Sequence, residues 1–345
     1  MSIELPSAFA QVAPHTTILD PFDAPQLRWG ILGAGGIART FARDVPAHSS
    51  QIISAVGSRD LSRAEQFAAE MGVEHAFGSY EDLVASDLVD AIYIATPHIR
   101  HRDDALLALR AGKPVLVEKA FAMTLKEAEE VFTEAQTQGL FAMEAMWSRH
   151  LPHYRFIAAA VAAGIGGDVV SVHADHGQSL RHVPRLMEAS LGGGSLHDLG
   201  VYSLHFSQFV LGRPQEIQAL TRPTSTGVTA AEMVVGKYPT ALSLASSNLD
   251  GRSATSGSIT FENFSIEMPT QFYRPTEVVL RTYPEGADHF HGEVHRWDAT
   301  VPGGFQYQVA EAARCIRAGM TESPVVPWQA TLDVMWMMDQ VSTHR

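Results

Sequence analysis

The sequence predicts an α/β protein in which a doubly wound parallel sheet is followed by a second, α+β domain with a large, mostly antiparallel open sheet. Short apolar segments alternate with amphipathic segments of helical period between residues 27 and 147, as they do when helices connect parallel strands. After residue 148, strand-like segments follow one another through short turns, which is typical of antiparallel pairing. We therefore expect an N-terminal arm (1–26), a first domain (27–147) and a second domain (148–345).

The first domain is expected to begin with the apolar strand LRWGIL and a helix that opens at a glycine-rich turn. Further strands are expected over 51–57, 89–95, 113–118 and 140–147, and helices over 33–45, 61–72, 100–112 and 125–139. Thr124 and Glu127 have the spacing of a capping box. In a parallel sheet of this kind, the residues that follow each strand lie at the edge that binds ligands.

The second domain mixes both kinds of element. Helices are expected over 152–164, 196–211, 305–319 and 330–341, and strands over 168–177, 215–223, 230–238, 240–248 and 255–263. Residues 1–26 contain several prolines and no clear periodicity. They form either an extended arm that packs on its own subunit or a neighbour, or a disordered segment.

Composition limits the classes of partner. The apolar fraction of 46% and the charged fraction of 18% are those of an ordinary globular protein. A net charge of −13 opposes binding to nucleic acid, and no apolar stretch approaches the length of a membrane span. The N-terminus lacks the basic start and apolar core of a signal peptide, and Cys315 is the only cysteine. We therefore expect a cytoplasmic protein whose partner is a small molecule or another protein.

The first motif is Gly33-x-Gly35-x-x-Ala38, directly between a strand and a helix. Gly33 allows a tight turn, Gly35 lets the backbone approach a pyrophosphate, and Ala38 lets the helix pack close to the sheet. Gly36 and Ile37 lie at the helix N-terminus, where free N–H groups attract phosphates. A tight strand-to-helix turn without a ligand is the alternative, but the surrounding βαβ pattern favours dinucleotide binding.

The end of the second strand indicates which dinucleotide binds. An NAD site usually has an acidic residue there for the ribose hydroxyls, whereas this chain has Ser58 and Arg59. Asp60 is expected to cap the next helix, and Arg63 lies one turn further on. Both guanidinium groups could meet at a 2′-phosphate, so NADP is favoured over NAD. Two solvated surface arginines are the alternative.

Two further strand ends carry polar residues. The third is followed by Thr96, Pro97 and His98, which would lie over the cofactor. His98 or His101 could contact the nicotinamide or the ribose, and capping or bracing the following helix is the alternative for each. The fourth ends in Glu118 and Lys119, close to where a nicotinamide would lie. A lysine can relay a proton and stabilise an alkoxide, and Glu118 could orient the lysine or hydrogen-bond the cofactor. A structural ion pair is the alternative.

A second constellation lies in LGGGSLHDLGVYSLHF, where Asp198 and Tyr202 are four residues apart on one helix face. A tyrosine close to a lysine can act as an acid and a base. The alternatives are a capping box formed by Ser195 and Asp198, and a core position for Tyr202.

A metal site is the remaining possibility among the polar residues. His173, Asp175, His176 and His197 have no recognised metal-ligand spacing. We therefore expect no metal.

The segments GILGAGGIA, ATPHIRH, AGKPVLVEKA and GGGSLHDLGVY occur in this order along the chain. From about Leu27 to its end, the chain resembles the glucose–fructose oxidoreductase / inositol dehydrogenase / MocA family. The segments SRDLSRA, EAMWSRHLP and LGGGSLHDLGVY are most similar to the branch of dimeric dihydrodiol dehydrogenases and NADP-dependent D-xylose dehydrogenases.

The resemblance implies a Rossmann domain followed by a domain that binds substrate and uses its open sheet for oligomerisation. It implies that Lys119 is catalytic and that Asp198 and Tyr202 lie beside the substrate, with Tyr202 as the preferred acid and base. Trp147 and Arg149 would lie near the substrate pocket. The expected function is NADP-dependent hydride transfer to or from a carbinol or carbonyl carbon of a sugar, polyol or diol. A non-catalytic, NADP-binding regulatory or interaction protein is the alternative.

The chain departs from the family pattern at two positions. Ala120 stands where the family has proline, and because a cis bond before a residue other than proline costs about 3 kcal/mol, we expect a trans bond or a strained loop. His176 stands where related sequences have an aromatic residue. That change favours a polar substrate over an aromatic dihydrodiol.

Overall fold

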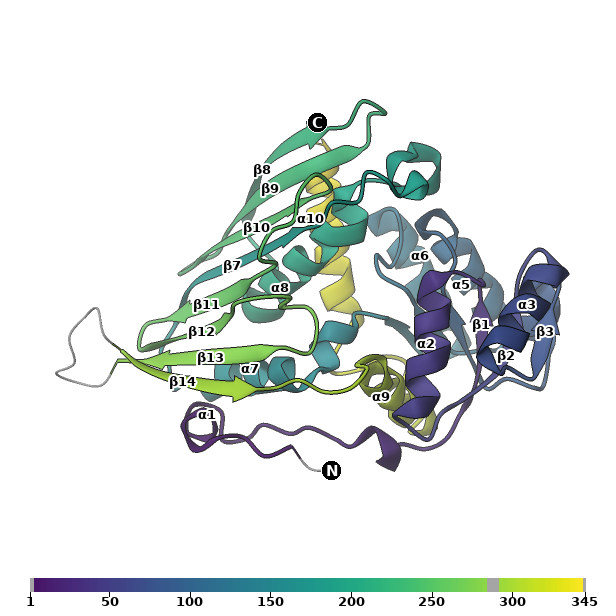
Figure 1. The fold of residues 1–345 in the computed structure, drawn as a ribbon, viewed down its shortest axis with the longest axis horizontal. Coiled ribbons are helices and arrows are strands. Elements are labelled where there is room, and N and C mark those ends of the chain that lie inside the picture. Colours follow the sequence, from purple (N-terminus) through teal and green to yellow (C-terminus); the bar gives the residue numbers. More distant parts are fainter. Residues whose placement is uncertain (1–2, 284–291, 344–345) are drawn as a thin grey trace. The chain divides into compact units, whose positions relative to one another are not determined.

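The computed structural model describes residues 3–283 and 292–343, and its chain forms two compact units (Figure 1). The parallel-sheet unit comprises Leu19–His150 and Gly303–Met335, and the mixed-sheet unit comprises Met1–Ile18, Leu151–Pro302 and Trp336–Arg345. These units are defined by compactness. The functional domains expected at 27–147 and 148–345 stay a prediction.

The parallel-sheet unit contains six parallel strands in the order β3-β2-β1-β4-β5-β6. The strands are β1 (Arg28–Leu32), β2 (Ile52–Gly57), β3 (His75–Phe77), β4 (Ala91–Ile94), β5 (Val115–Val117) and β6 (Ala142–Glu144). The helices are α2 (Gly36–Ala47), α3 (Leu61–Met71), α4 (Tyr80–Ala85), α5 (His101–Arg110), α6 (Leu125–Gln138) and α9 (Phe305–Arg317). This strand order reverses direction at β1 and β4, as in dinucleotide-binding folds. The doubly wound parallel sheet is therefore confirmed.

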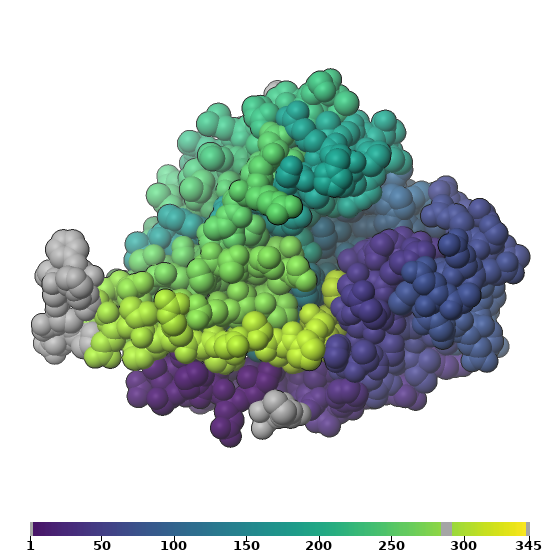
Figure 2. All heavy atoms as spheres, in the orientation of Figure 1, coloured from purple at the N-terminus to yellow at the C-terminus, as the bar shows by residue number. Residues whose placement is uncertain are grey.

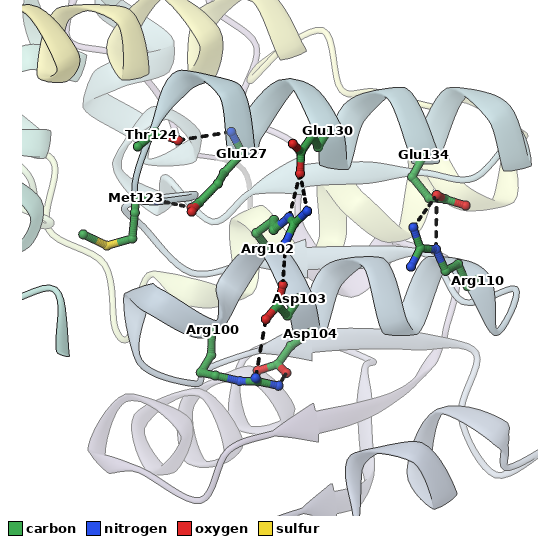
Figure 3. Close-up of polar contacts among 10 residues, drawn as sticks. All are labelled: Arg100, Arg102, Asp103, Asp104, Arg110, Met123, Thr124, Glu127, Glu130 and Glu134. Atoms are coloured by element: carbon green, nitrogen blue, oxygen red, sulfur yellow. Dashed lines mark hydrogen bonds and ion pairs between the residues drawn. The ribbon is translucent and has the colours of Figure 1, made fainter. Parts of the chain in front are cut away.

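Local sequence signals explain where two of these helices begin. The Asp60 carboxylate accepts a hydrogen bond from the backbone N–H of Ser62 (3.0 Å) and so caps α3. At α6 the Thr124 hydroxyl accepts from the N–H of Glu127 (3.2 Å), and the Glu127 carboxylate accepts from the N–H of Met123 (2.9 Å) (Figure 3). The predicted capping box is thus present, and it fixes the start of the helix just after Lys119.

The outer edge of β6 is occupied by a segment from late in the chain. The backbone N–H of Ala142 donates to the carbonyl of Thr321 (3.0 Å), and the Trp328 indole N–H donates to the carbonyl of Ala142 (2.8 Å). An edge strand with free hydrogen-bonding groups invites pairing with other chains, and these contacts satisfy both groups of Ala142. Trp328 begins α10 (Trp328–Thr343), the helix in which the chain passes from the parallel-sheet unit to the mixed-sheet unit.

The mixed-sheet unit contains eight strands in the order β14-β13-β12-β11-β7-β10-β9-β8 (Figure 1). Only the pairing of β7 with β10 is parallel, which confirms a large, mostly antiparallel open sheet. The strands are β7 (Val169–Gly177), β8 (Glu216–Pro223), β9 (Thr229–Lys237), β10 (Leu242–Asn248), β11 (Gly257–Phe261), β12 (Phe264–Met268), β13 (Glu277–Thr282) and β14 (Glu293–Asp298). Helix α7 (Pro152–Ala163) belongs to the same unit, and α8 (Val201–Leu211) packs on β7 and β10.

The sheet face that α8 leaves uncovered carries large exposed apolar side chains on β8, β9 and β10. Side chains alternate between buried and exposed along β9 and β10, so one face of these strands packs on the core. The other face presents large apolar side chains, which we call the β8–β10 face: Leu220, Met233, Val235, Leu242 and Leu244. Leu220 is 81% exposed and lies opposite Met233, which is 62% exposed. Contiguous exposed apolar patches are frequent at sites of protein association.

The N-terminal arm is packed on its own chain. Residues Ser7–Val12 form α1, and the fully buried ring of Phe9 contacts the rings of Phe156 (5.2 Å between centroids) and Trp297 (5.8 Å). In Figure 2 the purple N-terminal atoms lie along the yellow-green atoms of the β14 region. Of the two alternatives for the arm, packing on its own subunit is the one observed.

None of the described helices is both long enough and apolar enough to cross a membrane.

Candidate active site

The glycine-rich turn lies between β1 and α2. Gly33 has a φ of +102°, and a Cβ atom there would lie 2.8 Å from the carbonyl oxygen of Ala95, so only glycine fits. Cβ atoms added at Gly35 or Gly36 would meet no heavy atom within 4 Å. Ala38 is fully buried. The turn therefore packs tightly on the sheet side and is open on the side where a pyrophosphate would bind.

The residues after β2 leave two cations without a partner. Arg59 and Arg63 are both exposed, and neither guanidinium group makes a hydrogen bond or an ion pair within the part of the chain that the structure describes. The Asp60 carboxylate between them is engaged at the start of α3, where the hydrogen bond from Ser62 lowers its pKa. Ser58 is buried and its hydroxyl accepts from the N–H of Asp60 (3.3 Å). The free positive charge at this strand end suits a phosphate.

The segment after β4 contains a buried hydroxyl without a partner. Thr96 is 8% exposed, and among the described residues its Oγ1 has no hydrogen-bond partner. Buried polar atoms are hydrogen-bonded in most proteins, so this atom is a candidate contact for a ligand. Pro97, which follows it, is exposed. Thr96, the open glycines and the unpaired arginines are together a set of groups that fits a dinucleotide.

His98 and His101 hold the loop after β5 rather than the start of α5. The His98 Nε2 lies 3.2 Å from the carbonyl oxygen of Lys119. His101 is 1% exposed, with Nδ1 2.8 Å from the carbonyl of Ala120 and Nε2 2.8 Å from that of Thr96. Burial lowers the pKa of His101, which favours its neutral form. These rings contact loop carbonyl groups, so both the bracing of α5 and cofactor contact by either histidine stay predictions.

Glu118 and Lys119 follow β5. Glu118 is 6% exposed and accepts hydrogen bonds from the Tyr93 hydroxyl and from the backbone N–H of Lys119. Burial raises the pKa of Glu118 to about 7, although the hydrogen bond from Tyr93 acts in the opposite direction. The Lys119 side chain is only half-buried. The carboxylate is thus held in the interior, at the end of β5.

The peptide bond between Lys119 and Ala120 is cis. The expectation of a trans bond at this position was therefore wrong. The carbonyl groups of both residues are held by the rings of His98 and His101, contacts that the sequence did not predict.

Trp147 and Arg149 lie in a short 3₁₀ helix (Trp147–His150) that follows β6. Both are 6% exposed, and the Trp147 ring stacks on that of Phe305 with centroids 4.7 Å apart. They are therefore positioned after the last strand of the parallel sheet. Contact with a substrate stays a prediction for both.

Asp198 and Tyr202 lie in the mixed-sheet unit, where the π-helical turn η6 (Leu196–Gly200) leads into α8. Asp198 is 9% exposed and Tyr202 is 8% exposed. The Asp198 carboxylate accepts a hydrogen bond from the Arg185 guanidinium (2.9 Å). The Ser195 side chain does not cap the helix, so the alternative of a capping box with Asp198 is wrong. The Ser195 hydroxyl instead lies within hydrogen-bond distance of two acceptors on β9, the Thr229 carbonyl and the Glu232 carboxylate.

Tyr202 belongs to a ring cluster with His176 and Tyr273. The ring centroids of His176 and Tyr202 are 5.3 Å apart, and that of Tyr273 lies 4.4 Å from His176 and 4.6 Å from Tyr202. The Gln178 amide nitrogen lies 2.8 Å from the His176 Nε2 and 3.4 Å from the Tyr273 hydroxyl. The structure therefore brings predicted His176 and Tyr202 together and adds Tyr273, which no motif had indicated.

Residues of α5 and α6 line a hollow, and Figure 3 shows the polar contacts among several of their charged side chains. Arg102 pairs there with Glu130, and Arg110 pairs with Glu134 at 3.3 Å. Paired charges of this kind are typical of a solvated helix surface. Among the described residues, no group of three or more histidine, cysteine or acidic side chains is arranged to hold a metal.

Comparisons with known proteins cover both units. The model of the oxidoreductase family GFO/IDH/MocA with an NAD-binding Rossmann fold matches residues 27–146, and the model of the GFO/IDH/MocA C-terminal domain matches residues 154–260. A trans-1,2-dihydrobenzene-1,2-diol dehydrogenase from Bos taurus is 35% identical over 314 residues, which cover 87% of this chain and 91% of that protein. The corresponding protein of Homo sapiens is 32% identical over 323 residues, with the same coverage.

A solved structure gives the same result for the fold. The crystal structure of a 3-ketoreductase from Actinomadura kijaniata in complex with NADP and TDP-benzene superposes with a TM-score of 0.80. The two chains are 25% identical, and the superposition covers 92% of this chain and 98% of the other.

The glycine turn provides a test of dinucleotide binding. A Gly35→Ala variant should bind NADP roughly tenfold more weakly or worse, because its methyl group would fill space that is open in the protein alone. Its thermal unfolding temperature should stay near that of the wild type. Gly33→Ala should instead lower the unfolding temperature, because of its positive φ and its contact with the Ala95 carbonyl. Titration with NADP, read by protein fluorescence, and a thermal scan measure both effects. Unchanged NADP affinity in Gly35→Ala would show that no ligand approaches this turn.

Proposed function

Because this chain belongs to the GFO/IDH/MocA oxidoreductase family, we propose that it oxidises or reduces a CH–OH carbon of a polar sugar, polyol or diol, with NADP as the preferred cofactor. As a member of the family it is an NAD(P)-binding oxidoreductase. The observation that supports the proposed site most directly is the position of Lys119. It follows β5 at the sheet edge that also carries the open glycine turn and the unpartnered hydroxyl of Thr96.

The preference for NADP rests on the charges after β2. Arg59 and Arg63 are exposed and unpaired within the described chain, whereas Asp60 is held at the start of α3. A ribose with free hydroxyl groups is best bound by a carboxylate, and a 2′-phosphate is best bound by guanidinium groups. The residues after β2 offer guanidinium groups, which suit a 2′-phosphate.

The proposed chemistry divides the roles among three residues. When bound, the dinucleotide would accept or supply a hydride at its nicotinamide ring. Tyr202 takes the proton from the substrate hydroxyl during oxidation and returns it during reduction. Lys119 stabilises the negative charge that develops on that oxygen. Asp198, paired with Arg185, orients a neighbouring hydroxyl of the substrate.

The substrate is proposed to carry several hydroxyl groups. The relatives at 32–35% identity are named for a cyclic diol, which places vicinal diols in the candidate class. The His176 imidazole and the Gln178 amide lie beside Tyr202 and Tyr273. These groups can exchange hydrogen bonds with a polyol, whereas an aromatic side chain at position 176 would not. A sugar, a polyol or a non-aromatic diol is therefore favoured.

We also propose that two copies of the chain associate through the β8–β10 face. Five apolar side chains are exposed there on adjacent strands of one sheet, and burying them against a second copy would remove them from water. The net charge of −13 argues against a nucleic-acid partner. A single cysteine, buried in the structure, suits a reducing compartment such as the cytoplasm.

The catalytic roles are tested with two substitutions. Lys119→Ala and Tyr202→Phe should each lower kcat by about 10²- to 10⁴-fold, the usual contribution of a general acid or base, while NADP still binds. Turnover of D-xylose and of trans-1,2-dihydrobenzene-1,2-diol is followed by the absorbance of the reduced nicotinamide. Lys126→Ala and Tyr283→Phe, at exposed positions, are the matched controls. Near-normal turnover in both test variants would rule out this mechanism. NADP binding without turnover of a broad panel of sugars and diols would favour a regulatory protein.

Cofactor preference is tested by Arg59→Ala. The variant should lose affinity for NADP by about tenfold or more, since it loses a contact to the 2′-phosphate, and its affinity for NAD should change little. Arg110→Ala, which removes a paired arginine of α5, should change neither affinity. Isothermal titration with each dinucleotide gives the comparison. Equal losses for NADP and NAD would show that Arg59 does not contact the 2′-phosphate.

The proposed dimer contact is tested by charge insertion. A Leu220→Lys, Met233→Lys double variant should have the mass of a monomer in light scattering at micromolar concentration, because two opposed cations would be buried. The wild type should have the mass of a dimer or a larger assembly. Ile165→Lys changes an apolar residue that is 50% exposed outside the sheet face and should leave the assembly intact. A monomeric wild type, or no change in the double variant, would exclude this face as the contact.

A further inference from the structure

A buried carboxylate on β9 lies beneath the helical turn that carries Asp198. Glu232 is 3% exposed, and its side chain points to the side of the sheet that faces the core, as the alternation along β9 requires. The turn η6 packs on β7, β9 and β10. An ionisable group in such a position is costly unless its oxygens are hydrogen-bonded. The contacts of Glu232 therefore indicate what the carboxylate does.

Two hydroxyl groups donate to the two carboxylate oxygens. The Ser195 hydroxyl, at the start of η6, donates to Oε2, and the Ser247 hydroxyl, on β10, donates to Oε1. Ser247 is also the residue paired with Glu232 across the two strands. Ser195 has a second acceptor within reach, the carbonyl of Thr229 at 3.2 Å. The carboxylate thus ties the start of η6 to two strands of the sheet.

The same carboxylate explains the glycine between Asp198 and Tyr202. A Cβ atom added to Gly200 would overlap the Oε1 of Glu232 and would lie 3.2 Å from the Ser247 hydroxyl. Gly200 has an ordinary helical φ of −60°, so its backbone conformation does not require glycine. The absence of a side chain at Gly200 makes room for Glu232.

The turn that Glu232 supports is irregular. Residues Leu196–Gly200 are π-helical, and the N–H of Val201 donates to the carbonyl of Leu196. A π-helical turn inside an α-helix is usually destabilising by itself and is frequent at functional sites. Asp198 lies in this turn and Tyr202 lies two residues beyond Gly200, so any change in the turn alters how the two side chains are presented.

We propose that Glu232 is a positioning residue for the reaction: its carboxylate holds Ser195 and occupies the space beside Gly200, and so fixes the π-helical turn that presents Asp198 and Tyr202. This inference rests on the proposed function, because it concerns the geometry of the proposed acid and base. It assigns a role to a residue outside every motif of the sequence. It also assigns Ser195 and Gly200 to the support of the turn rather than to the substrate.

Substitution of Glu232 gives the first test, with D-xylose or trans-1,2-dihydrobenzene-1,2-diol as substrate, whichever the wild type converts faster. Glu232→Ala should lower kcat about 10²-fold, the cost of a small misplacement of a catalytic group. The KM for NADP should stay within about twofold, because the proposed cofactor residues are elsewhere in the chain. Amide hydrogen exchange over residues 195–202 should become faster.

Two matched variants separate positioning from simple loss of stability. Glu232→Gln should retain kcat within about fivefold, because Ser195 can turn its hydroxyl to the Thr229 carbonyl and accept from the new amide group. Glu267→Ala removes a half-buried glutamate of β12 in the same sheet and should change neither kcat nor the exchange rates. A normal kcat in folded Glu232→Ala, or unchanged exchange over 195–202, would overturn the proposal.

Gly200→Ala completes a double-mutant cycle, in which the fold-change in kcat caused by this substitution is compared between the wild type and Glu232→Ala. The substitution should lower kcat in the wild type, where the methyl group meets Glu232, and should cost little in the Glu232→Ala background, where that space is empty. Equal effects in both backgrounds would overturn the proposal. If Lys119→Ala and Tyr202→Phe both retain near-normal turnover, the proposed mechanism fails. If Tyr202→Phe is inactive while Glu232→Ala is normal, only the role of Glu232 fails.

Discussion

The parallel hydrogen bonding of β1 to both β2 and β4 is the constraint on which the candidate cofactor site depends. It places β1 in the middle of the sheet, and the chain leaves β1 and β4 in opposite directions across the sheet. The carboxyl ends of β1, β2, β4, β5 and β6 therefore share one edge. The glycine turn, the two arginines, Thr96 and Lys119 are distant in sequence, and each follows a different strand of this sheet. Their common position is a consequence of strand order and requires no direct contact among them.

The mixed-sheet unit holds its proposed site residues in a different way. Asp198 and Tyr202 come from a helix that lies on a sheet, and hydrogen bonds between buried polar groups hold that helix in register. Glu232 accepts from two serine hydroxyls, and Arg185 neutralises Asp198. Such groups contribute little net stability, because their burial costs solvation energy. They do favour one arrangement of the turn over others, and a residue that transfers protons needs a fixed arrangement.

The sequence predicted the parts of this protein that depend on local pattern. The alternation of apolar and amphipathic segments gave the parallel sheet, and the capping residues gave the starts of α3 and α6. Strand β3 and helix α4 were missed because they are short and only partly apolar. Strands β13 and β14 alternate weakly, and β12 was missed although its five residues alternate between apolar and polar.

Long-range contacts were beyond the sequence patterns. Tyr273 follows no motif, and its approach to His176 depends on the pairing of distant strands. The sequence pattern predicts only that Glu232 lies in a strand. The bond after Lys119 was mispredicted for the same reason, since the histidines that hold its two carbonyl groups lie about one helix earlier in the chain.

The contact of β6 with the segment around Thr321 has a consequence for synthesis. The six strands of the parallel sheet are synthesised long before Thr321 and Trp328. These two residues complete the outer edge of that sheet. Until then Ala142 offers its backbone groups to any neighbouring strand, including one from another nascent chain. The nascent polypeptide therefore passes through a stage in which the outer edge of β6 has no partner segment. Moving the Thr321 segment earlier in the chain by circular permutation would shorten this exposed period.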